Sequence, residues 1–375
     1  MVFTNKKTIL IVAGEESGDL HGSSLVGEMD QRMPELSFFG IGGDRLQDGG
    51  VETIEHTDNM AVMGFSEVVS KYRFLRKVFQ NIVKEIDRRN PERAILIDYP
   101  GFNLRLAKKL KERGVPVTYF ISPQVWAWKE KRVEVIRKCV DQLICIFPFE
   151  EAWYAKRGVD ATFVGHPFMD MPEPEISREE FLQQHEFDPD RTTIALMPGS
   201  RQQEVNRHLS VMVKSLFNLR QRGMNLQAVI GKAPGVNIRG VNYHGLSVEE
   251  ANPQLALRFA DGAVVASGTI SFEAALYNTP SVVIYKLSPF TWFFAKRIAK
   301  VEHVSMPNLI AGRELFPELL QEKATPELVA ANLQLLLADE EKQDEIYSGM
   351  AEVQNAMGEP GAAKRAAKLI LQKLE

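Results

Sequence analysis

Residues 8–19 have the sequence Thr-Ile-Leu-Ile-Val-Ala-Gly-Glu-Glu-Ser-Gly-Asp. The apolar run 8–13 predicts a strand that is covered on both faces, as the strands of parallel sheets are. It is too short for the core of a signal peptide, and Glu15 and Glu16 follow it almost at once. The glycines at 14 and 18 predict a turn that leads into a helix from about Asp19. A buried strand, a turn and a helix are the opening unit of a parallel α/β fold.

The same alternation continues through the first half of the chain. Longer amphipathic stretches, such as 102–111 and 130–138, predict helices between the strands. The further strands predicted in this half are 37–39, 94–97, 117–121, 142–146 and 161–164.

The alternation stops at 169–175, where Pro172 and Pro174 are each followed by a glutamate. This stretch predicts a linker. A second alternation follows, with strands predicted at 193–197, 226–230, 262–266 and 281–285, and the pattern is helical from Pro326 onward. We therefore expect an α/β protein of two Rossmann-like domains, residues 1–168 and 176–349, with parallel sheets facing across a cleft.

The composition agrees with a two-domain globular protein. The chain has 375 residues, of which 45% are hydrophobic and 25% charged, and single cores rarely exceed about 250–300 residues. A net charge of -4 argues against a general nucleic-acid binder. Cys139 and Cys145, in or beside the apolar run 143–147, predict buried thiols and a reducing compartment. No apolar stretch approaches the ~20 residues of a spanning helix.

Ligands of open α/β sheets bind at the carboxyl ends of strands, so residues that directly follow a strand are candidates. After 8–13, Ser17 and Gly18 lie in a loop that matches neither the dinucleotide nor the Walker A pattern, and glycines for a tight turn are the alternative. After 94–97, Asp98 suits a general base for a hydroxyl nucleophile. Because Pro100 and Gly101 follow, a turn-forming or helix-capping aspartate is the alternative there.

A third loop, 122–128, has the sequence Ser-Pro-Gln-Val-Trp-Ala-Trp and precedes a basic run at 129–132. Trp126 and Trp128 are two of the four tryptophans. Indole rings stack on sugars and favour membrane interfaces, although packing on the core is an equal alternative.

The second half offers two loops of similar kind after its strands. The loop 198–201 ends in an arginine, whose planar fork suits a diphosphate, and the loop 267–269 opens a helix. A carboxylate one turn further on suits ribose hydroxyls. The candidate ligands of a nucleotide diphosphate are Ser200, Arg201, Ser267, Gly268, Thr269 and Glu273. Asn308, in an apolar loop, can both donate and accept hydrogen bonds.

An apolar stripe with helical spacing follows Phe65. Its members include Val68, Val69, Tyr72 and Leu75, and basic residues at 71, 73, 76 and 77 flank it. The stretch 289–297 has a similar mixture. Such a stripe belongs either to a helix packed on its own sheet or to a surface that meets a membrane.

Taken in order, these motifs resemble the lipid-A-disaccharide synthase family. The resemblance is carried by residues 14–19, 61–64, 97–98 with Asn103, 122–128, 198–201, 266–269 with Glu273, and 307–314. Each motif is weak alone, but the ordered set over 14–314 is specific. The segment 231–245 departs from the family pattern, so no uracil ligand is identified.

The resemblance implies a GT-B fold and an inverting transfer from UDP-2,3-diacylglucosamine to 2,3-diacylglucosamine 1-phosphate. The products are a β-linked lipid A disaccharide 1-phosphate and UDP, and no cofactor or metal is expected. By the same resemblance Asp98 is the catalytic base, Arg201 a diphosphate ligand, Glu273 a ribose ligand and Asn308 an active-site residue.

The resemblance also implies partners and a location. C-terminal helices, from about 350 to 375, are expected to cross back onto the first domain, and the chain to form a homodimer that exchanges them. Acylated substrates favour the membrane interpretation of Val68, Val69, Tyr72 and Leu75, and an acceptor or membrane role for Trp126 and Trp128. We expect a cytoplasmic protein bound peripherally to the inner membrane.

Two other functions agree with the same residues. A UDP-N-acetylglucosamine epimerase of the same fold would act without an acceptor, so UDP release that depends on an acylated acceptor separates it from a transferase. A non-catalytic nucleotide-sugar sensor would bind tightly without turnover.

Overall fold

The computed structural model describes residues 7–60, 68–127, 129–171, 173–238, 245–287, 292 and 303–374, with the backbone alone at 68–72. The chain divides into two compact units. Unit 1 comprises Met1–Met171 and Met357–Glu375, and unit 2 comprises Pro172–Ala356. The C-terminal segment from 357 is therefore part of unit 1, whereas residues 350–356 belong to unit 2.

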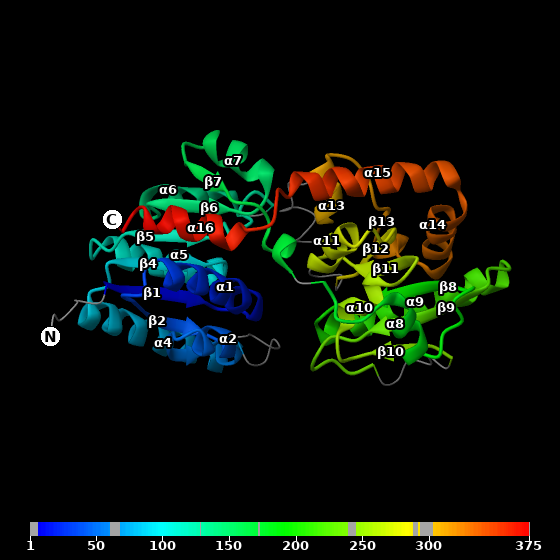
Figure 1. The fold of residues 1–375 in the computed structure, drawn as a ribbon, viewed down its shortest axis with the longest axis horizontal. Coiled ribbons are helices and arrows are strands. Elements are labelled where there is room, and N and C mark those ends of the chain that lie inside the picture. Colours follow the sequence, from blue (N-terminus) through cyan, green and yellow to red (C-terminus); the bar gives the residue numbers. More distant parts are fainter. Residues whose placement is uncertain are drawn as a thin grey trace. The chain divides into compact units, whose positions relative to one another are not determined.

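Unit 1 is built on a parallel sheet with the strand order β3-β2-β1-β4-β5-β6-β7 among the described residues (Figure 1). This is the order of a Rossmann-like sheet, extended by one strand. The strands are β1 (Lys7–Ala13), β2 (Leu36–Gly42), β3 (Glu52–His56), β4 (Arg93–Ile97), β5 (Val117–Phe120), β6 (Gln142–Cys145) and β7 (Ala161–Phe163).

Helices cover both faces of central strands that are apolar throughout. All five residues of β4 are buried, which is what a strand covered on both sides requires. The helices of unit 1 are α1 (Glu16–Arg32), α2 (Asp44–Asp48), α3 (Thr57–Met60), α4 (Val68–Arg89), α5 (Pro100–Lys111), α6 (Val133–Cys139), α7 (Pro148–Ala155) and α16 (Ala362–Leu371), with short 3-10 helices at Glu130–Arg132 and Pro167–Asp170.

Helix α4 uses part of the predicted apolar stripe to pack on its own sheet. Val78, Ile82 and Ile86 are buried in the core of unit 1, and the half-buried Leu75 packs against that core. The side chains of Val68, Val69 and Tyr72 lie outside the described residues, as do the stretch 61–64 and nearly all of 289–297.

Unit 2 repeats the architecture with the order β10-β9-β8-β11-β12-β13, and its described pairs are all parallel. The strands are β8 (Thr192–Met197), β9 (Leu226–Gly231), β10 (Ser247–Glu249), β11 (Gly262–Ala266), β12 (Ser281–Tyr285) and β13 (Glu318–Leu320). The helices are α8 (Arg178–Gln184), α9 (Gln202–Gln221), α10 (Pro253–Arg258), α11 (Thr269–Leu276), α13 (Met306–Ala311), α14 (Pro326–Ala338) and α15 (Glu340–Ala356), with a 3-10 helix at Gln321–Lys323.

The C-terminal helix α16, red in Figure 1, packs against α1. Polar side chains from the amino-terminal ends of three strands fix the end of the chain. Arg93 donates to the carbonyl of Lys373 at 3.5 Å, Gln142 to that of Leu369 at 3.0 Å, and Lys7 to that of Leu374. These donors satisfy carbonyls that a helix C-terminus leaves without partners.

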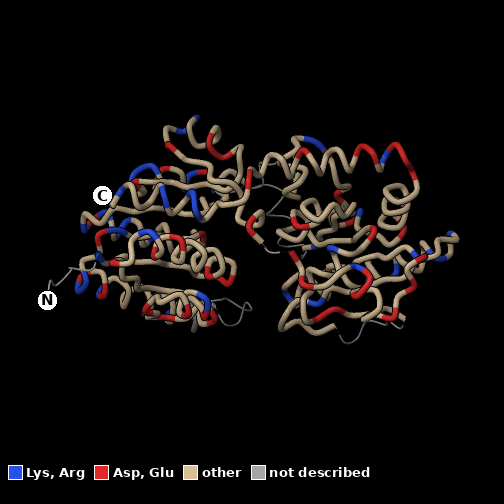
Figure 2. The backbone as a smooth tube through the Cα atoms, in the orientation of Figure 1, with Lys and Arg blue, Asp and Glu red and all other residues tan. Residues whose placement is uncertain are grey.

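Lys and Arg are interspersed with Asp and Glu along the backbone of both units (Figure 2). Within the described part of the chain, no helix combines the length and apolar character needed to cross a bilayer. The same residues hold no group of three or more His, Cys, Asp or Glu side chains arranged for a metal ion. Both cysteines are buried free thiols, Cys145 in β6 and Cys139 at the end of α6.

Candidate active site

Each sheet has one point at which the strand order reverses direction, and ligands of such sheets bind there. In unit 1 this point lies between β1 and β4, where Ala13 pairs with Ile97. The residues that follow these strands, Gly14 and Asp98, are therefore neighbours. In unit 2 it lies between β8 and β11, where Met197 pairs with Val265. The loops 198–201 and 267–269 follow those two strands.

Asp98 stands on an unusual turn at the end of β4. Asp98 and Tyr99 both have left-handed backbone angles, with φ of 41° and 47°. Burial raises the pKa of the Asp98 carboxyl to about 6, and the nearby Glu15 carboxylate adds to the shift. The Tyr99 backbone N–H acts in the opposite direction but does not outweigh them. A carboxyl with a pKa near the working pH is suited to accept a proton.

Gly14 is required because the Tyr99 ring occupies the space beside it. A Cβ atom at position 14 would lie 2.2 Å from Cδ1 of Tyr99. The same ring is fixed at its other end, where its hydroxyl donates to the carbonyl of Met60 at 3.3 Å. The glycine after β1 therefore permits the turn after β4.

Helix α1 begins at Glu16, three residues before the predicted start, because acidic residues are favoured in a first helical turn. Ser17 is exposed at this end, and Gly18 is buried where a Cβ would meet that of Ala13 at 3.3 Å. The Asp19 carboxylate turns inward and accepts from the backbone N–H groups of Gly43, Arg45 and Leu46 at 2.6, 3.1 and 3.2 Å.

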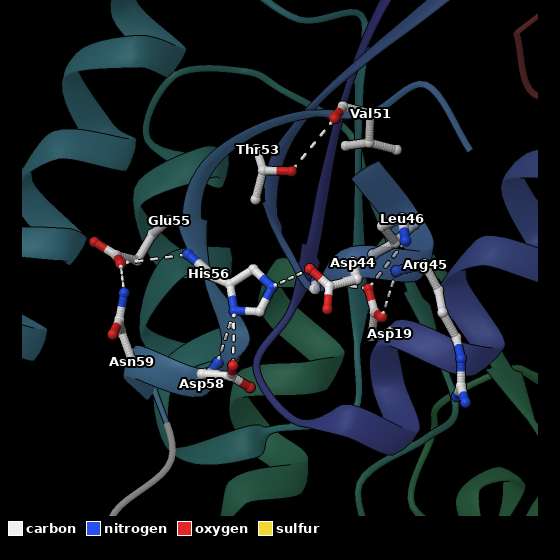
Figure 3. A network of polar contacts seen from close by, with 11 residues as sticks. Asp19, Asp44, Arg45, Leu46, Val51, Thr53, Glu55, His56, Asp58 and Asn59 are labelled. Carbon is white, nitrogen blue, oxygen red and sulfur yellow. Dashed lines mark hydrogen bonds and ion pairs between the residues drawn. The ribbon is translucent and has the colours of Figure 1, made fainter. Parts of the chain in front are cut away.

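Asp19 thereby caps α2 from another helix, because the N-cap residue of α2 is Gly43 and has no side chain. Figure 3 shows this contact beside a second polar cluster, in which His56 lies between Asp44 and Asp58. The network joins α1 to the loop after β2, so Asp19 supports the architecture around the first loop.

The loop 122–128 is held by a buried carboxylate that sequence reasoning missed. Glu150 of α7 accepts from the Ser122 hydroxyl at 2.6 Å and from the Trp126 indole N–H at 3.1 Å. The Tyr154 hydroxyl donates to the carbonyl of Pro123 at 2.9 Å. Trp126 is only 8% exposed, so it shapes the loop, and its contact with a ligand stays a prediction. Trp128 lies outside the described residues.

In unit 2, Ser200 and Arg201 are exposed at the start of α9. The Arg201 guanidinium is 77% exposed and lies 3.4 Å from the Glu204 carboxylate. A buried histidine fixes the loop from below: Nδ1 of His208 donates to the carbonyl of Pro198 at 2.9 Å, and Nε2 accepts from the N–H of Lys286 at 3.0 Å. Burial lowers the pKa of His208, which agrees with the neutral ring that this pair of bonds needs.

The second loop of unit 2 exposes Gly268 and Thr269 at the start of α11, and no side chain caps this helix. The Ser267 hydroxyl donates to the carbonyl of Val304 at 3.1 Å. One turn into the helix lies Glu273, 8% exposed, whose Oε2 is buried without a hydrogen-bond partner. Burial raises the pKa of Glu273 to about 7. An unpartnered buried carboxyl group is costly and marks a candidate ligand site.

Asn308 is fully buried, and its amide is committed to the protein. Its Nδ2 donates to the main-chain carbonyl of Phe316 and to the Glu318 carboxylate, both at 2.8 Å. Its Oδ1 accepts from the N–H groups of Leu315 and Phe316 at 2.9 and 2.8 Å. With two hydrogens donated and two lone pairs occupied, the amide has no capacity left for a substrate.

The structure thus brings together the predicted residues of each half at one strand-end locus. In unit 1, Asp98 and the loop of Ser17 and Gly18 follow two strands that pair with each other. In unit 2, the loops of Arg201 and Ser267 likewise follow two paired strands. The supporting residues Glu150, His208 and Glu318 belong to none of the motifs that the sequence analysis identified.

Comparison with known proteins covers nearly the whole chain. A family model described as "Lipid-A-disaccharide synthetase" matches residues 9–373. The lipid-A-disaccharide synthase of Syntrophus aciditrophicus is 41% identical over 385 residues, covering 98% of each chain. That of Myxococcus xanthus is 40% identical over 379 residues, covering 99% of this chain and 98% of the relative.

Solved structures resemble the whole chain at low sequence identity. A putative UDP-N-acetylglucosamine 2-epimerase from Listeria monocytogenes has a TM-score of 0.70 at 13% identity, with coverage of 99% and 97%. The calicheamicin glycosyltransferase has a TM-score of 0.63 at 13% identity, with coverage of 99% and 98%.

This structural likeness concerns the fold, and it confirms the predicted α/β class with two Rossmann-like domains of the GT-B type. It does not favour the epimerase alternative, because the sequence match decides the family. The chain belongs to the lipid-A-disaccharide synthase family of glycosyltransferases.

Proposed function

We propose that this protein transfers 2,3-diacylglucosamine from UDP-2,3-diacylglucosamine to 2,3-diacylglucosamine 1-phosphate. Family membership supports the reaction. The observation that carries the mechanism is the Asp98 carboxyl at the strand-order reversal of unit 1, with its pKa raised to about 6. Such a group is ionised at neutral pH and still basic enough to take a proton.

In the proposed step, the carboxylate of Asp98 removes the proton from the acceptor's primary hydroxyl. The hydroxyl oxygen forms a bond to the anomeric carbon of the donor sugar while the bond from that carbon to UDP breaks. UDP leaves with the electron pair. A single displacement inverts the anomeric centre, which gives the β-linked disaccharide 1-phosphate.

Unit 2 would bind UDP and stabilise the charge that develops on it. The exposed Arg201 guanidinium and Ser200 lie at the start of the 20-residue helix α9, and Gly268 and Thr269 lie at the uncapped start of α11. Both helix ends favour phosphate oxygens. Glu273, whose Oε2 has no partner in the protein, would accept hydrogen bonds from the ribose hydroxyls.

Asn308 takes a positioning role in this proposal. It holds the Glu318 carboxylate, which in turn accepts from the N–H groups of Val304 and Ser305. Because Ser267 donates to the carbonyl of Val304, the arrangement supports the phosphate loop 267–269. Ser17 and Gly18 remain proposed contacts of the UDP-sugar, with Gly18 also allowing α1 to approach β1.

We further propose that the protein works as a homodimer at the cytoplasmic face of the inner membrane. The side chains of Arg73, Arg76 and Lys77 on α4 are exposed, and basic side chains attract anionic head groups. Substituting Val68, Val69 and Tyr72 by serine should reduce sedimentation with anionic vesicles, and unchanged sedimentation would count against this surface. Light scattering that finds a monomer at working concentrations would remove the dimer.

The reaction is tested by mass analysis of the products formed from the two acylated sugars. The wild-type protein should release UDP only when the acceptor is present, which separates a transferase from an epimerase and from a sensor. Asp98→Asn should lower kcat by about 10²–10⁴-fold. Asparagine tolerates the left-handed backbone as well as aspartate does, so this variant keeps the turn. Full activity of Asp98→Asn would exclude the proposed base.

A further inference from the structure

The turn that carries Asp98 is strained. Asp98 and Tyr99 are consecutive residues with positive φ, 41° and 47°. A positive φ is uncommon for residues other than glycine, and although aspartate tolerates it, for a bulky residue such as Tyr99 it is an outlier. Such angles persist only where the surroundings enforce them, and they cluster at functional sites. The question is therefore which groups hold this turn.

Two buried donors hold the main-chain carbonyl of Asp98. The Tyr119 hydroxyl, from the neighbouring strand β5, donates to it, and Nδ2 of Asn103 donates to it at 2.8 Å. Nδ2 of Asn103 also reaches the carbonyl of Ile97 at 3.1 Å. Tyr119 and Asn103 are both fully buried. A carbonyl that accepts twice in the interior has a fixed direction.

These two donors are committed to the turn at a cost. Oδ1 of Asn103 is buried without a hydrogen-bond partner, and an unsatisfied buried acceptor lowers stability. Burial raises the pKa of the Tyr119 phenol well above its ordinary value, so the hydroxyl keeps its proton and remains a donor. The protein thus accepts both backbone strain and an unpaired polar atom at one turn.

We propose that Tyr119 and Asn103 are positioning residues for Asp98. By holding its main-chain carbonyl they maintain the left-handed turn, and the turn sets the direction of the carboxyl group toward the acceptor hydroxyl. Neither residue is assigned contact with the substrate. The inference rests on the proposed role of Asp98 as the base.

Tyr119→Phe is the sharpest test, because it removes one buried oxygen and keeps the ring. We expect kcat to fall about tenfold with KM for both sugars unchanged, since misplacement of a reacting group by a fraction of an ångström acts on the chemical step. In the Asp98→Asn background, Tyr119→Phe should cause no further loss, because its effect passes through the carboxyl. Product formation is followed by mass analysis, with long incubation for the Asp98→Asn proteins.

Thr279→Val is the matched control. Thr279 is fully buried, and its hydroxyl donates to the carbonyl of Leu257 at 2.9 Å, away from the candidate site. The control should lower the melting temperature to a similar extent and keep kcat, because it too loses one buried hydrogen bond. A fall in kcat for Tyr119→Phe alone would then not be a consequence of general destabilisation.

Two results would overturn the proposal. One is wild-type kcat in Tyr119→Phe, and the other is an equal fall of kcat in the wild-type and Asp98→Asn backgrounds, which would place the effect elsewhere. A fully active Asp98→Asn protein would refute the proposed base itself and the positioning role with it. That outcome differs from a silent Tyr119→Phe, so the two failures are told apart.

Discussion

At the scale of single residues, the informative groups are two carboxyls that the protein shields from water, one of which, Glu273, has an oxygen without a hydrogen-bond partner. Asp98 and Glu273 both have raised pKa values, about 6 and about 7, with burial as the main cause. Glu318, by contrast, is surrounded by donors from Val304, Ser305 and Asn308. A buried carboxyl that the fold does not satisfy lowers stability, so its persistence points to a use with substrate.

The raised pKa of Asp98 predicts the acid limb of the pH profile. The base acts only when ionised, so kcat/KM should fall about tenfold per pH unit as the pH drops below about 6. Glu15→Gln removes a neighbouring negative charge that raises this pKa, so the limb should move to lower pH. Steady-state kinetics from pH 5 to 9 measure both. A limb that Glu15→Gln leaves in place would contradict the assignment of the limb to Asp98.

Glu273→Gln should stabilise the free protein and weaken UDP binding. The folded pKa of about 7 exceeds the ordinary 4.5, so the ionised group lowers stability above pH 7, and this penalty disappears as the pH falls to 4.5. At pH 8 the variant should gain about 1–3 kcal/mol in thermal unfolding. Its affinity for UDP should fall about tenfold or more by calorimetry, because a charged acceptor is lost.

Glu179→Gln, an exposed carboxylate on α8, is the control and should change neither quantity. A Glu273→Gln protein that unfolds more easily and binds UDP as well as the wild type would show that this carboxyl serves the fold.

At this scale the sequence predicts which residue follows a strand, but not what contacts it. Asp98 and Arg201 were accessible to that reasoning because each follows an apolar run. Glu150 and His208 were not accessible in this way, because each has a partner far away in the chain. Trp126 lies 24 residues from Glu150, and Lys286 lies 78 residues from His208. Only the folded chain shows that these polar groups are buried and paired.

At the scale of elements, the central strands were predictable, whereas of the four edge strands in the described residues only β7 was predicted, at 161–164. Strands β11 and β12 have the predicted bounds because both are continuous apolar runs. The edge strands β3, β10 and β13 were missed: β3 reads Glu-Thr-Ile-Glu-His, and the other two have three residues each. Polar edges are common because they resist pairing with other chains, and they leave no hydrophobic period to detect.

Helix α7 illustrates how one element fixes the loop of another. Glu150 is the acceptor for Ser122 and Trp126 with one oxygen, and for the N–H groups of Ile146 and Phe147 with the other. Burial raises its pKa to about 7, although these donors act in the opposite direction. In Glu150→Gln an amide NH₂ replaces one acceptor and faces two donors.

We therefore expect Glu150→Gln to lose about 1–3 kcal/mol of stability and to change the tryptophan fluorescence as Trp126 becomes more exposed. Glu134→Gln, which removes an ion pair with Arg137 whose side chains are 51% and 47% exposed, should change both very little. Thermal unfolding and emission spectra decide the matter. Wild-type values for Glu150→Gln would show that the loop does not depend on this carboxylate.

At the scale of the whole molecule, the chain order and the folded units differ. Residues 357–374 follow unit 2 in the sequence but belong to unit 1. The start of α16 is capped by Asp170, whose carboxylate accepts from the N–H groups of Gly361 and, at 3.0 Å, Ala362. The stability of the first unit therefore depends on a segment that follows the second unit in the chain.

Arg365 is the residue on which this return depends most. Its Nε donates to the carbonyl of Val164 at 2.7 Å, and its Nη1 to that of Pro360 at 2.8 Å, so one side chain joins α16 to the end of β7. Arg365→Ala should lower the free energy of opening of unit 1 by about 2–3 kcal/mol, because several charged hydrogen bonds are lost together. Amide hydrogen exchange in α1 and β6 should then be about 30–100-fold faster, whereas β8 and β11 of unit 2 keep their rates.

Arg313→Ala, which breaks an ion pair with Glu352 whose side chains are 43% and 53% exposed, should leave both units unchanged. Equal acceleration in both units after Arg365→Ala would mean that the chain opens as one cooperative body, and that the C-terminal segment does not stabilise unit 1 in particular.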